Sequence, residues 1–84
     1  MYYVYIIKNK DNRHYIGQTN SLEYRIEMHN KNLVKSTRNL GPWEYVITRQ
    51  CNSRSEAMTL ELQLKKMKNS KKAIEYLTPQ SYPD

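Results

Sequence analysis

The sequence predicts a small α/β domain in which helices flank a mainly antiparallel three-stranded sheet, in the order β-β-α-β-α-α. Two runs rich in Val, Ile and Tyr stand near the N-terminus with a polar turn between them, which is typical of a β-hairpin. A third run of this kind follows Gly41-Pro42. Between and after these runs, apolar residues recur at the spacing of amphipathic helices.

The chain has 84 residues, which is enough for one domain with a modest core. We expect the domain to span residues 1–77 and residues 78–84 to form a loose C-terminal tail. Cys51 is the single cysteine, so no internal disulfide can form, which favours a reducing compartment. No signal peptide and no apolar stretch near the about 20 residues of a membrane span are visible. A cytoplasmic protein with no membrane contact is therefore expected.

The formal net charge of +6 at pH 7 limits the kinds of partner that suit the surface. Phosphodiester backbones are the commonest partners of small basic domains, but an inert solvated surface would have the same composition. A protein-binding adaptor would need an exposed apolar patch, and a sequence with 38% hydrophobic residues gives little sign of one. The charge alone does not decide between nucleic acid and no partner.

The first two strands are predicted at residues 2–7 and 14–17, joined by a turn rich in Asn and Asp. If this hairpin closes symmetrically about Lys10, Tyr5 lies opposite Tyr15. One face then carries Tyr3, Tyr5, Tyr15 and Gly17, and the other carries Val4, Ile6 and Ile16. The phenolic face includes a glycine that leaves room for a ligand, and an aromatic ladder that only stabilises the sheet is the alternative.

A first helix is expected over residues 21–30, with Asn20 as its N-cap and Glu23 as the partner in a capping box. Arg25 and His29 are four residues apart and therefore share one flank of this helix. That flank borders the apolar stripe, so both side chains would point toward the edge of the core. Two solvated side chains are the alternative interpretation.

A long polar loop is predicted over residues 31–40, and loops of this length are often functional. Its Lys35 and Arg38 are candidate contacts to nucleic acid, or else belong to an ordinary surface loop. The third strand follows at residues 43–49. Strict alternation would place three of its residues on one face: Trp43, Tyr45 and Ile47.

A second helix opens with the capping box of Ser53 and Glu56 and extends to about Lys68. Its buried stripe is predicted to contain Ala57, Leu60, Leu64 and Met67. Glu61 falls inside this stripe, where a carboxylate is rare unless it is paired or bound to a metal. A metal ligand and an edge glutamate in an ion pair are both consistent with this position.

A short last helix is expected over residues 71–77, with Ser70 as its N-cap. Lysines crowd the junction before it: Lys65, Lys66, Lys68, Lys71 and Lys72. These side chains either contact phosphate or form the solvated face of a helix end, where cations suit the helix dipole.

The chain contains an ordered set of residues: Tyr5, then Tyr15-Ile16-Gly17, then Arg25 on the first helix and Glu61 on a later one. This set resembles the GIY-YIG nuclease domain. More narrowly, it is similar to the small stand-alone GIY-YIG proteins of bacteria, whose function is largely uncharacterised. The resemblance covers about residues 2–77, which is nearly the entire chain.

The resemblance implies roles for the residues of the hairpin. Tyr5 and Tyr15 match tyrosines that orient or deprotonate the attacking water, and Gly17 matches a glycine that lets backbone and substrate come close. Our hypothesis is that Tyr5 is the general base, which requires its pKa to fall through nearby Arg25 or the metal. His29 matches a histidine of some branches and is the rival base.

The resemblance also implies how phosphate and metal are held. Arg25 matches the arginine that binds the scissile phosphate, and Glu61 matches the glutamate that holds the divalent metal. One Mg²⁺ or Mn²⁺ ion, completed by water and phosphate, would stabilise the leaving 3′ oxygen. A two-metal site would need several converging carboxylates, and the histidines and Cys51 lack the spacing of a zinc site.

Two positions depart from the family pattern. Tyr3 stands in place of the first-motif glycine, and Gln18 stands where excision-repair members carry a lysine. The implied function is a metal-dependent DNA endonuclease that acts in DNA repair or processing. One form of this expectation is an enzyme that is specific for particular DNA structures. Recognition of DNA shape or ends, or a partner protein, would replace the added domains that give other members their specificity. The alternative is a nucleic-acid-binding module that keeps the nuclease fold with little or no catalysis.

Overall fold

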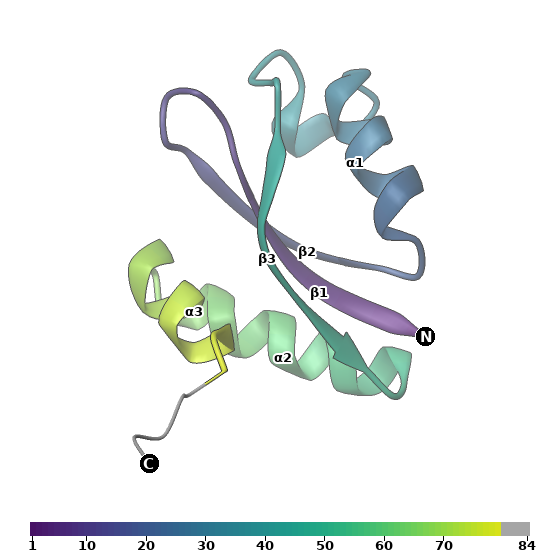
Figure 1. The fold of residues 1–84 in the computed structure, drawn as a ribbon, viewed down its shortest axis with the longest axis vertical. Helices are drawn as coiled ribbons and strands as arrows, with labels where there is room; N and C mark the ends of the chain where they lie inside the picture. Colours follow the sequence, from purple (N-terminus) through teal and green to yellow (C-terminus); the bar gives the residue numbers. More distant parts are fainter. Residues whose placement is uncertain (80–84) are drawn as a thin grey trace.

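The computed structural model describes residues 1–79, and residues 80–84 of the expected tail lie outside the described part. One antiparallel sheet separates α1 on one face from α2 and α3 on the other (Figure 1). The elements, in chain order, are β1 (Tyr2–Lys8), β2 (His14–Thr19), α1 (Leu22–Asn30), the 3₁₀ turn η1 (Lys35–Thr37), β3 (Glu44–Cys51), α2 (Arg54–Lys66) and α3 (Ser70–Leu77). The predicted fold class and element order are confirmed.

Strand β1 lies in the centre of the sheet, which has the order β2-β1-β3. Tyr5 pairs with Gly17 and not with Tyr15, so the predicted register of the hairpin is wrong. The turn closes later than expected because the Asn9 side chain accepts hydrogen bonds from the backbone N–H groups of Asp11 and Arg13. Since each partner moves by two residues and side chains alternate with a period of two, the predicted faces are kept.

Strand β3 contains a bulge that the sequence pattern does not reveal. Ile6 of β1 pairs with Ile47, whereas Ile7 pairs with Tyr45, which leaves Val46 as the extra residue. The alternation therefore changes phase, and Tyr45 faces α1 while Ile47 packs on the opposite side of the sheet. The prediction that Trp43, Tyr45 and Ile47 share a face is wrong for Ile47.

The main core lies between the sheet and the helices α2 and α3 and is almost wholly aliphatic. Its buried members are Val4, Ile6, Cys51, Ala57, Leu60, Leu64, Ala73 and Leu77. A second cluster lies between the sheet and α1, around buried Tyr5, Ile7 and Trp43. Within residues 1–79, no helix is long and apolar enough to cross a lipid bilayer.

The helix N-termini are capped as their sequences suggest, with two shifts of one residue. Ser53 caps α2 as predicted. Ser21 caps α1 in place of Asn20, and the Thr19 hydroxyl holds the backbone of Ser21 in position. Asn69 caps α3 in place of Ser70, because its side-chain oxygen reaches a backbone N–H in the first turn.

Candidate active site

The phenolic face of the hairpin packs against α1. The ring centroids of Tyr5 on β1 and Tyr15 on β2 are 6.4 Å apart. A Cβ atom added at Gly17 would lie only 2.5 Å from the Tyr5 hydroxyl oxygen. Gly17 therefore leaves the space that the Tyr5 hydroxyl occupies, and a side chain at this position would clash with it.

A chain of hydrogen bonds runs inward from Arg25 through the buried side chains. The Arg25 Nε group donates to the Tyr5 hydroxyl oxygen at 3.2 Å. The distance from the Tyr5 hydroxyl to His29 Nε2 is 2.8 Å, and that from His29 Nδ1 to the Thr37 hydroxyl is 2.7 Å. The Thr37 hydroxyl also makes a long contact of 3.5 Å with the carbonyl oxygen of Val34.

The direction of donation along this chain of hydrogen bonds follows from the donor groups that are available. The Arg25 Nε–H group can only donate, so the Tyr5 oxygen accepts and its own hydrogen points to His29 Nε2. His29 then carries its hydrogen on Nδ1 and donates to Thr37, whose hydrogen points to the Val34 carbonyl. With the opposite histidine tautomer, the Tyr5 hydrogen would have no acceptor in the observed contacts. The network therefore assigns a neutral His29 that accepts from Tyr5.

The pKa shifts agree with this protonation state. Burial raises the pKa of Tyr5 to about 12, although the hydrogen bond and charge of Arg25 act in the opposite direction. Burial and then the charge of Arg25 lower the pKa of His29 to about 4. Arg25 thus acts in the direction that the hypothesis of Tyr5 as general base requires, but desolvation is the larger effect, so the required fall in the pKa of Tyr5 does not occur in the free protein. At neutral pH, both side chains are uncharged.

Access differs between the two layers of the site. Tyr5 and His29 are fully buried, whereas Tyr15 and Arg25 are half-buried. Burial lowers the pKa of the Arg25 guanidinium, but the hydroxyl groups of Tyr5 and Tyr15 raise it by more. Arg25 also lines a surface hollow of about 370 Å³, together with Arg54. Tyr15 and Arg25 are therefore the residues of the set that a ligand could reach first.

Glu61 lies on α2, on the opposite side of the sheet from α1. Its side chain is 18% exposed, and its Oε2 atom is 2.6 Å from the Lys65 ammonium. The same ammonium stands 5.9 Å from the centroid of the Tyr15 ring. Glu61 is thus linked to the rest of the set through Lys65, and it forms the ion pair that was the alternative interpretation of its place in the stripe.

The residues around Glu61 suit one particular kind of metal site. Within residues 1–79, no group of three or more His, Cys, Asp or Glu side chains is placed to hold a metal ion. Mg²⁺ is commonly held by one or two carboxylates, with water and substrate phosphates as its other ligands. A half-buried single carboxylate fits such a site, in which the substrate supplies part of the coordination shell.

Comparison with known proteins agrees with the sequence motifs and the fold. Residues 1–74 match the family described as the GIY-YIG catalytic domain. The chain belongs to the GIY-YIG family.

Several uncharacterised GIY-YIG relatives are similar over most of this chain. The UPF0213 protein CPE1444 of Clostridium perfringens is 41% identical over 73 residues, which cover 86% of this chain and 78% of that protein. The UPF0213 protein OB0043 of Oceanobacillus iheyensis is 39% identical over 67 residues, which cover 79% and 78% of the two chains. The solution NMR structure of the UPF0213 protein BH0048 from Bacillus halodurans has 38% sequence identity and a TM-score of 0.53, with coverage of 86% and 79%.

The GIY-YIG fold brings most of the predicted site residues together, but not the two in the loop. Tyr5, Tyr15, Gly17, Arg25 and His29 meet between β1, β2 and α1. Lys35 and Arg38 are exposed, and the described hydrogen bonds and ion pairs do not connect either side chain to this set. Their role as contacts to nucleic acid stays a prediction.

Thr37 is the member of the network that sequence reasoning missed. It lies fully buried in a polar basic loop, three residues after buried Val34. A 3₁₀ turn has three residues per turn, so this spacing places both on one side and could have marked the loop as inward-facing. The loop is held by Trp43, whose indole N–H donates to the Thr37 carbonyl at 3.4 Å and whose backbone is bonded by the Asn30 side chain.

Proposed function

We propose that this protein is a structure-specific, divalent-metal-dependent endonuclease that hydrolyses DNA phosphodiester bonds in repair or processing. The observation that carries the proposal is the meeting of Tyr15, Gly17 and Arg25 at edge strand β2, next to the buried pair of Tyr5 and His29. A guanidinium presents a planar fork of donors that suits phosphate. The net charge of +6 favours a polyanionic substrate.

The hydrogen-bond chain supports a route for the proton of the attacking water. In the proposed reaction Tyr15 orients the water, and Tyr5 takes its proton while passing its own proton to His29 Nε2. The water oxygen forms the new bond to phosphorus, and the bond from phosphorus to the 3′ oxygen breaks. The route fits because His29 Nε2 is an acceptor 2.8 Å from the Tyr5 hydroxyl.

Charge neutralisation is assigned to Arg25 and to a metal ion at Glu61. Arg25 would bind the non-bridging oxygens of the scissile phosphate. When bound, a Mg²⁺ or Mn²⁺ ion supplies Lewis-acid stabilisation of the leaving 3′ oxygen. Lys65 competes for the Glu61 carboxylate in the free protein, because its ammonium is 2.6 Å from Oε2.

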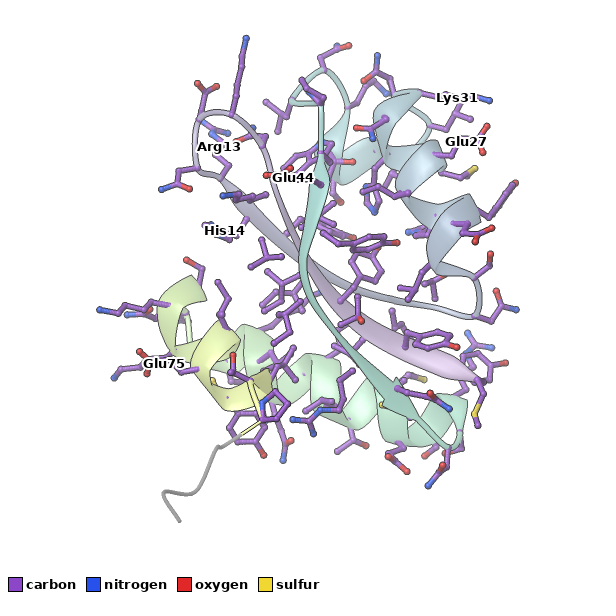
Figure 2. The ribbon with its side chains drawn as sticks, viewed as in Figure 1. Arg13, His14, Glu27, Lys31, Glu44 and Glu75 are labelled. Carbon is purple, nitrogen blue, oxygen red and sulfur yellow. The ribbon has the colours of Figure 1, made fainter. Side chains whose placement is uncertain are left out.

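The test is a cleavage assay on labelled duplex, flap, branched and single-stranded DNA, with Mg²⁺ and then Mn²⁺. We expect the wild type to cleave at least one substrate and Arg25→Ala and Glu61→Gln to lose that activity. Glu75→Gln is the matched control for Glu61→Gln, because Glu75 is exposed and points away from α3 into solvent (Figure 2). Full activity in the Arg25 and Glu61 variants would overturn the proposal.

The same assay under single-turnover conditions assigns the proton acceptor. Tyr5→Phe should slow cleavage by about 10²-fold or more, the usual range for a general base, and His29→Ala should slow it similarly because the two act as a unit. If Tyr5→Phe kept its full rate while His29→Ala lost activity, the role would pass to His29. A loss confined to Tyr15→Phe would assign the role of proton acceptor to Tyr15, the half-buried tyrosine of the set.

A second candidate function is a nucleic-acid-binding module without catalysis. The observation that favours it is the ion pair of Glu61 with Lys65, which engages the carboxylate proposed to hold the metal. Such a module would bind DNA in a salt-dependent way, would cleave none of the four substrates, and would bind no Mn²⁺ through Glu61.

A further inference from the structure

A second hollow, of about 270 Å³, lies beside the candidate active site between β2 and the end of α2. Ile16 and Leu64 give it apolar lining, and Tyr15 belongs to its wall. His14, at the start of β2, lies on the side of the sheet nearest the junction of α2 and α3 (Figure 2). The hollow therefore touches a member of the site, whereas Arg25 lines a different hollow.

The rim of this hollow carries positive charge without a carboxylate. Lys65 and Lys68 line it with His14, and none of its lining residues is acidic. By contrast, the hollow at the turn of the hairpin is lined by Glu44 as well as by lysines. An anion in the hollow would thus meet two lysines and no acidic lining residue, and the carboxylate nearest to them is that of Glu61, which is paired with Lys65.

Lys68 occupies an unusual backbone position for a lysine. Within residues 1–79, four non-glycine residues have positive φ, and three of them are asparagines: Asn12, Asn32 and Asn39. Asparagine tolerates this left-handed region, whereas a long side chain is strained there. Lys68 is the exception, with φ of 51° at the residue after Met67, the C-cap of α2. Helices commonly end in a left-handed residue at this position, and the Lys68 backbone N–H donates to the Lys65 carbonyl there, so the end of α2 places Lys68 in the lining of the hollow.

Lys65 joins the hollow to the catalytic set. Its ammonium is 2.6 Å from Glu61 Oε2 and 5.9 Å from the centroid of the Tyr15 ring. The Lys65 side chain is 48% exposed, so solvent reaches one member of its ion pair with Glu61, and partly solvated pairs of residues four apart contribute little to stability. Its four-carbon stem and point charge allow it to exchange one anionic partner for another with little strain.

We propose that this hollow binds a second backbone phosphate of the nucleic acid, neighbouring the one that Arg25 binds, with Lys65 and Lys68 as its ligands. Lys65 leaves Glu61 when this phosphate enters, which frees the carboxylate as the substrate arrives. The backbone then follows edge strand β2 from the Arg25 side to the Lys65 side. This inference rests on the proposed nucleic-acid substrate, and it adds a subsite and the residues that form it.

The test measures the salt dependence of DNA binding by Lys65→Gln/Lys68→Gln. The protein is titrated into a short labelled duplex at salt concentrations of about 50 to 200 mM. The buffer contains Ca²⁺ in place of Mg²⁺. Loss of one phosphate contact should make the slope of log K against log salt shallower by about 0.9 and weaken binding about eightfold near 0.1 M salt. Lys65→Arg/Lys68→Arg should keep the wild-type slope, because the charges remain.

The matched control is Lys66→Gln/Lys72→Gln, which removes the same net charge from exposed lysines outside the hollow. A slope change for the Lys65/Lys68 pair that clearly exceeds that of the control pair would support the subsite. Equal slopes for the two pairs would overturn the inference and leave the proposed function intact. If the wild type bound no DNA in a salt-dependent way, the proposed function and the subsite would both be overturned.

Discussion

Strand β1 sends alternate side chains into two cores that differ in chemistry. Val4 and Ile6 enter the aliphatic core beneath α2 and α3, whose buried members include no hydrogen-bonding side chain beyond the Cys51 thiol. Tyr5, which lies between them in sequence, enters the layer beneath α1 and is bonded to His29 and Arg25. One side is stabilised by non-directional apolar burial and the other by directional hydrogen bonds. Neighbouring residues of a single strand thus provide apolar packing on one face of the sheet and directional hydrogen bonds on the other.

The largest effect is expected on the aliphatic side, from Leu64→Ala. Leu64 is buried to 1% exposure, so truncation should lower the free energy of unfolding by about 2–5 kcal/mol through lost burial and a cavity. Leu62→Ala is the matched control, because Leu62 is 58% exposed on the same helix and should change stability by less than about 0.5 kcal/mol. Urea denaturation measures both. Similar values for the two variants would contradict the location of the core.

The second-largest effect is expected in the hydrogen-bonded layer beneath α1, where the protonation of His29 makes the stability of the protein depend on pH. The pKa of His29 is about 4 in the folded protein and about 6.5 in the unfolded chain, so the unfolded state binds more protons between these values. Stability from this group is therefore present above pH 6.5 and is lost as pH falls toward 4, by about 3 kcal/mol in total. Denaturation across this range should show the loss in the wild type and not in His29→Gln.

His14→Gln is the control for this pH dependence, since His14 is half-buried at the start of β2. The variant should keep the wild-type loss of stability between pH 6.5 and 4. If the wild type and His29→Gln lost stability in parallel, the neutral, buried state assigned to His29 would be wrong.

A smaller effect is expected from Thr37→Val, which removes the hydroxyl that accepts from His29. One lost hydrogen bond should cost about 1 kcal/mol of stability. The sharper measurement is ¹⁵N NMR of the imidazole, where Thr37→Val should reduce the preference for the Nδ1–H tautomer and Thr37→Ser should restore it. An unchanged tautomer in Thr37→Val would mean that Thr37 only fills space, as Leu64 does.

The smallest effect concerns the ion pair that links the two sides of the sheet. Lys65→Gln leaves Glu61 without its partner, so Mn²⁺ should bind about twofold more tightly in the absence of DNA, the value of one exposed helical ion pair. Paramagnetic broadening of the NMR signals of α2 measures this affinity. Lys66→Gln should leave the affinity at the wild-type value, and weaker Mn²⁺ binding by Lys65→Gln would contradict the competition between lysine and metal.

Much of the fold was predictable because its signals are local. The capping box at Ser53 needs only neighbouring residues, and the faces of the hairpin follow from a period of two. The register of the hairpin was missed because Asn9 folds its side chain over the turn. The bulge at Val46 was missed because it depends on how β3 meets β1, which composition does not encode.

The candidate site was predictable in its membership but not in its chemistry. Tyr5, Arg25 and His29 were found from spacing and resemblance, and the structure brings them within hydrogen-bonding distance. The rise in the pKa of Tyr5 could not be foreseen, because it depends on how deeply the ring is buried. Thr37 escaped because its loop looks solvent-exposed in composition, while its inward turn is fixed by contacts with Trp43.

The order of strands has a consequence for how the molecule opens. Strand β1 is bonded to a neighbour on each side, whereas β2 is bonded to β1 alone. Local fluctuations begin at such edges, well before the whole domain unfolds. The site therefore combines residues of two strands that differ in local stability. Tyr5 lies on the central strand β1, which should open last, whereas Tyr15 and Gly17 lie on the edge strand β2, which can fray by itself. Amide hydrogen exchange should be fast along β2 and slow along β1, so admission of a ligand to the Tyr5 hydroxyl need not disturb the core.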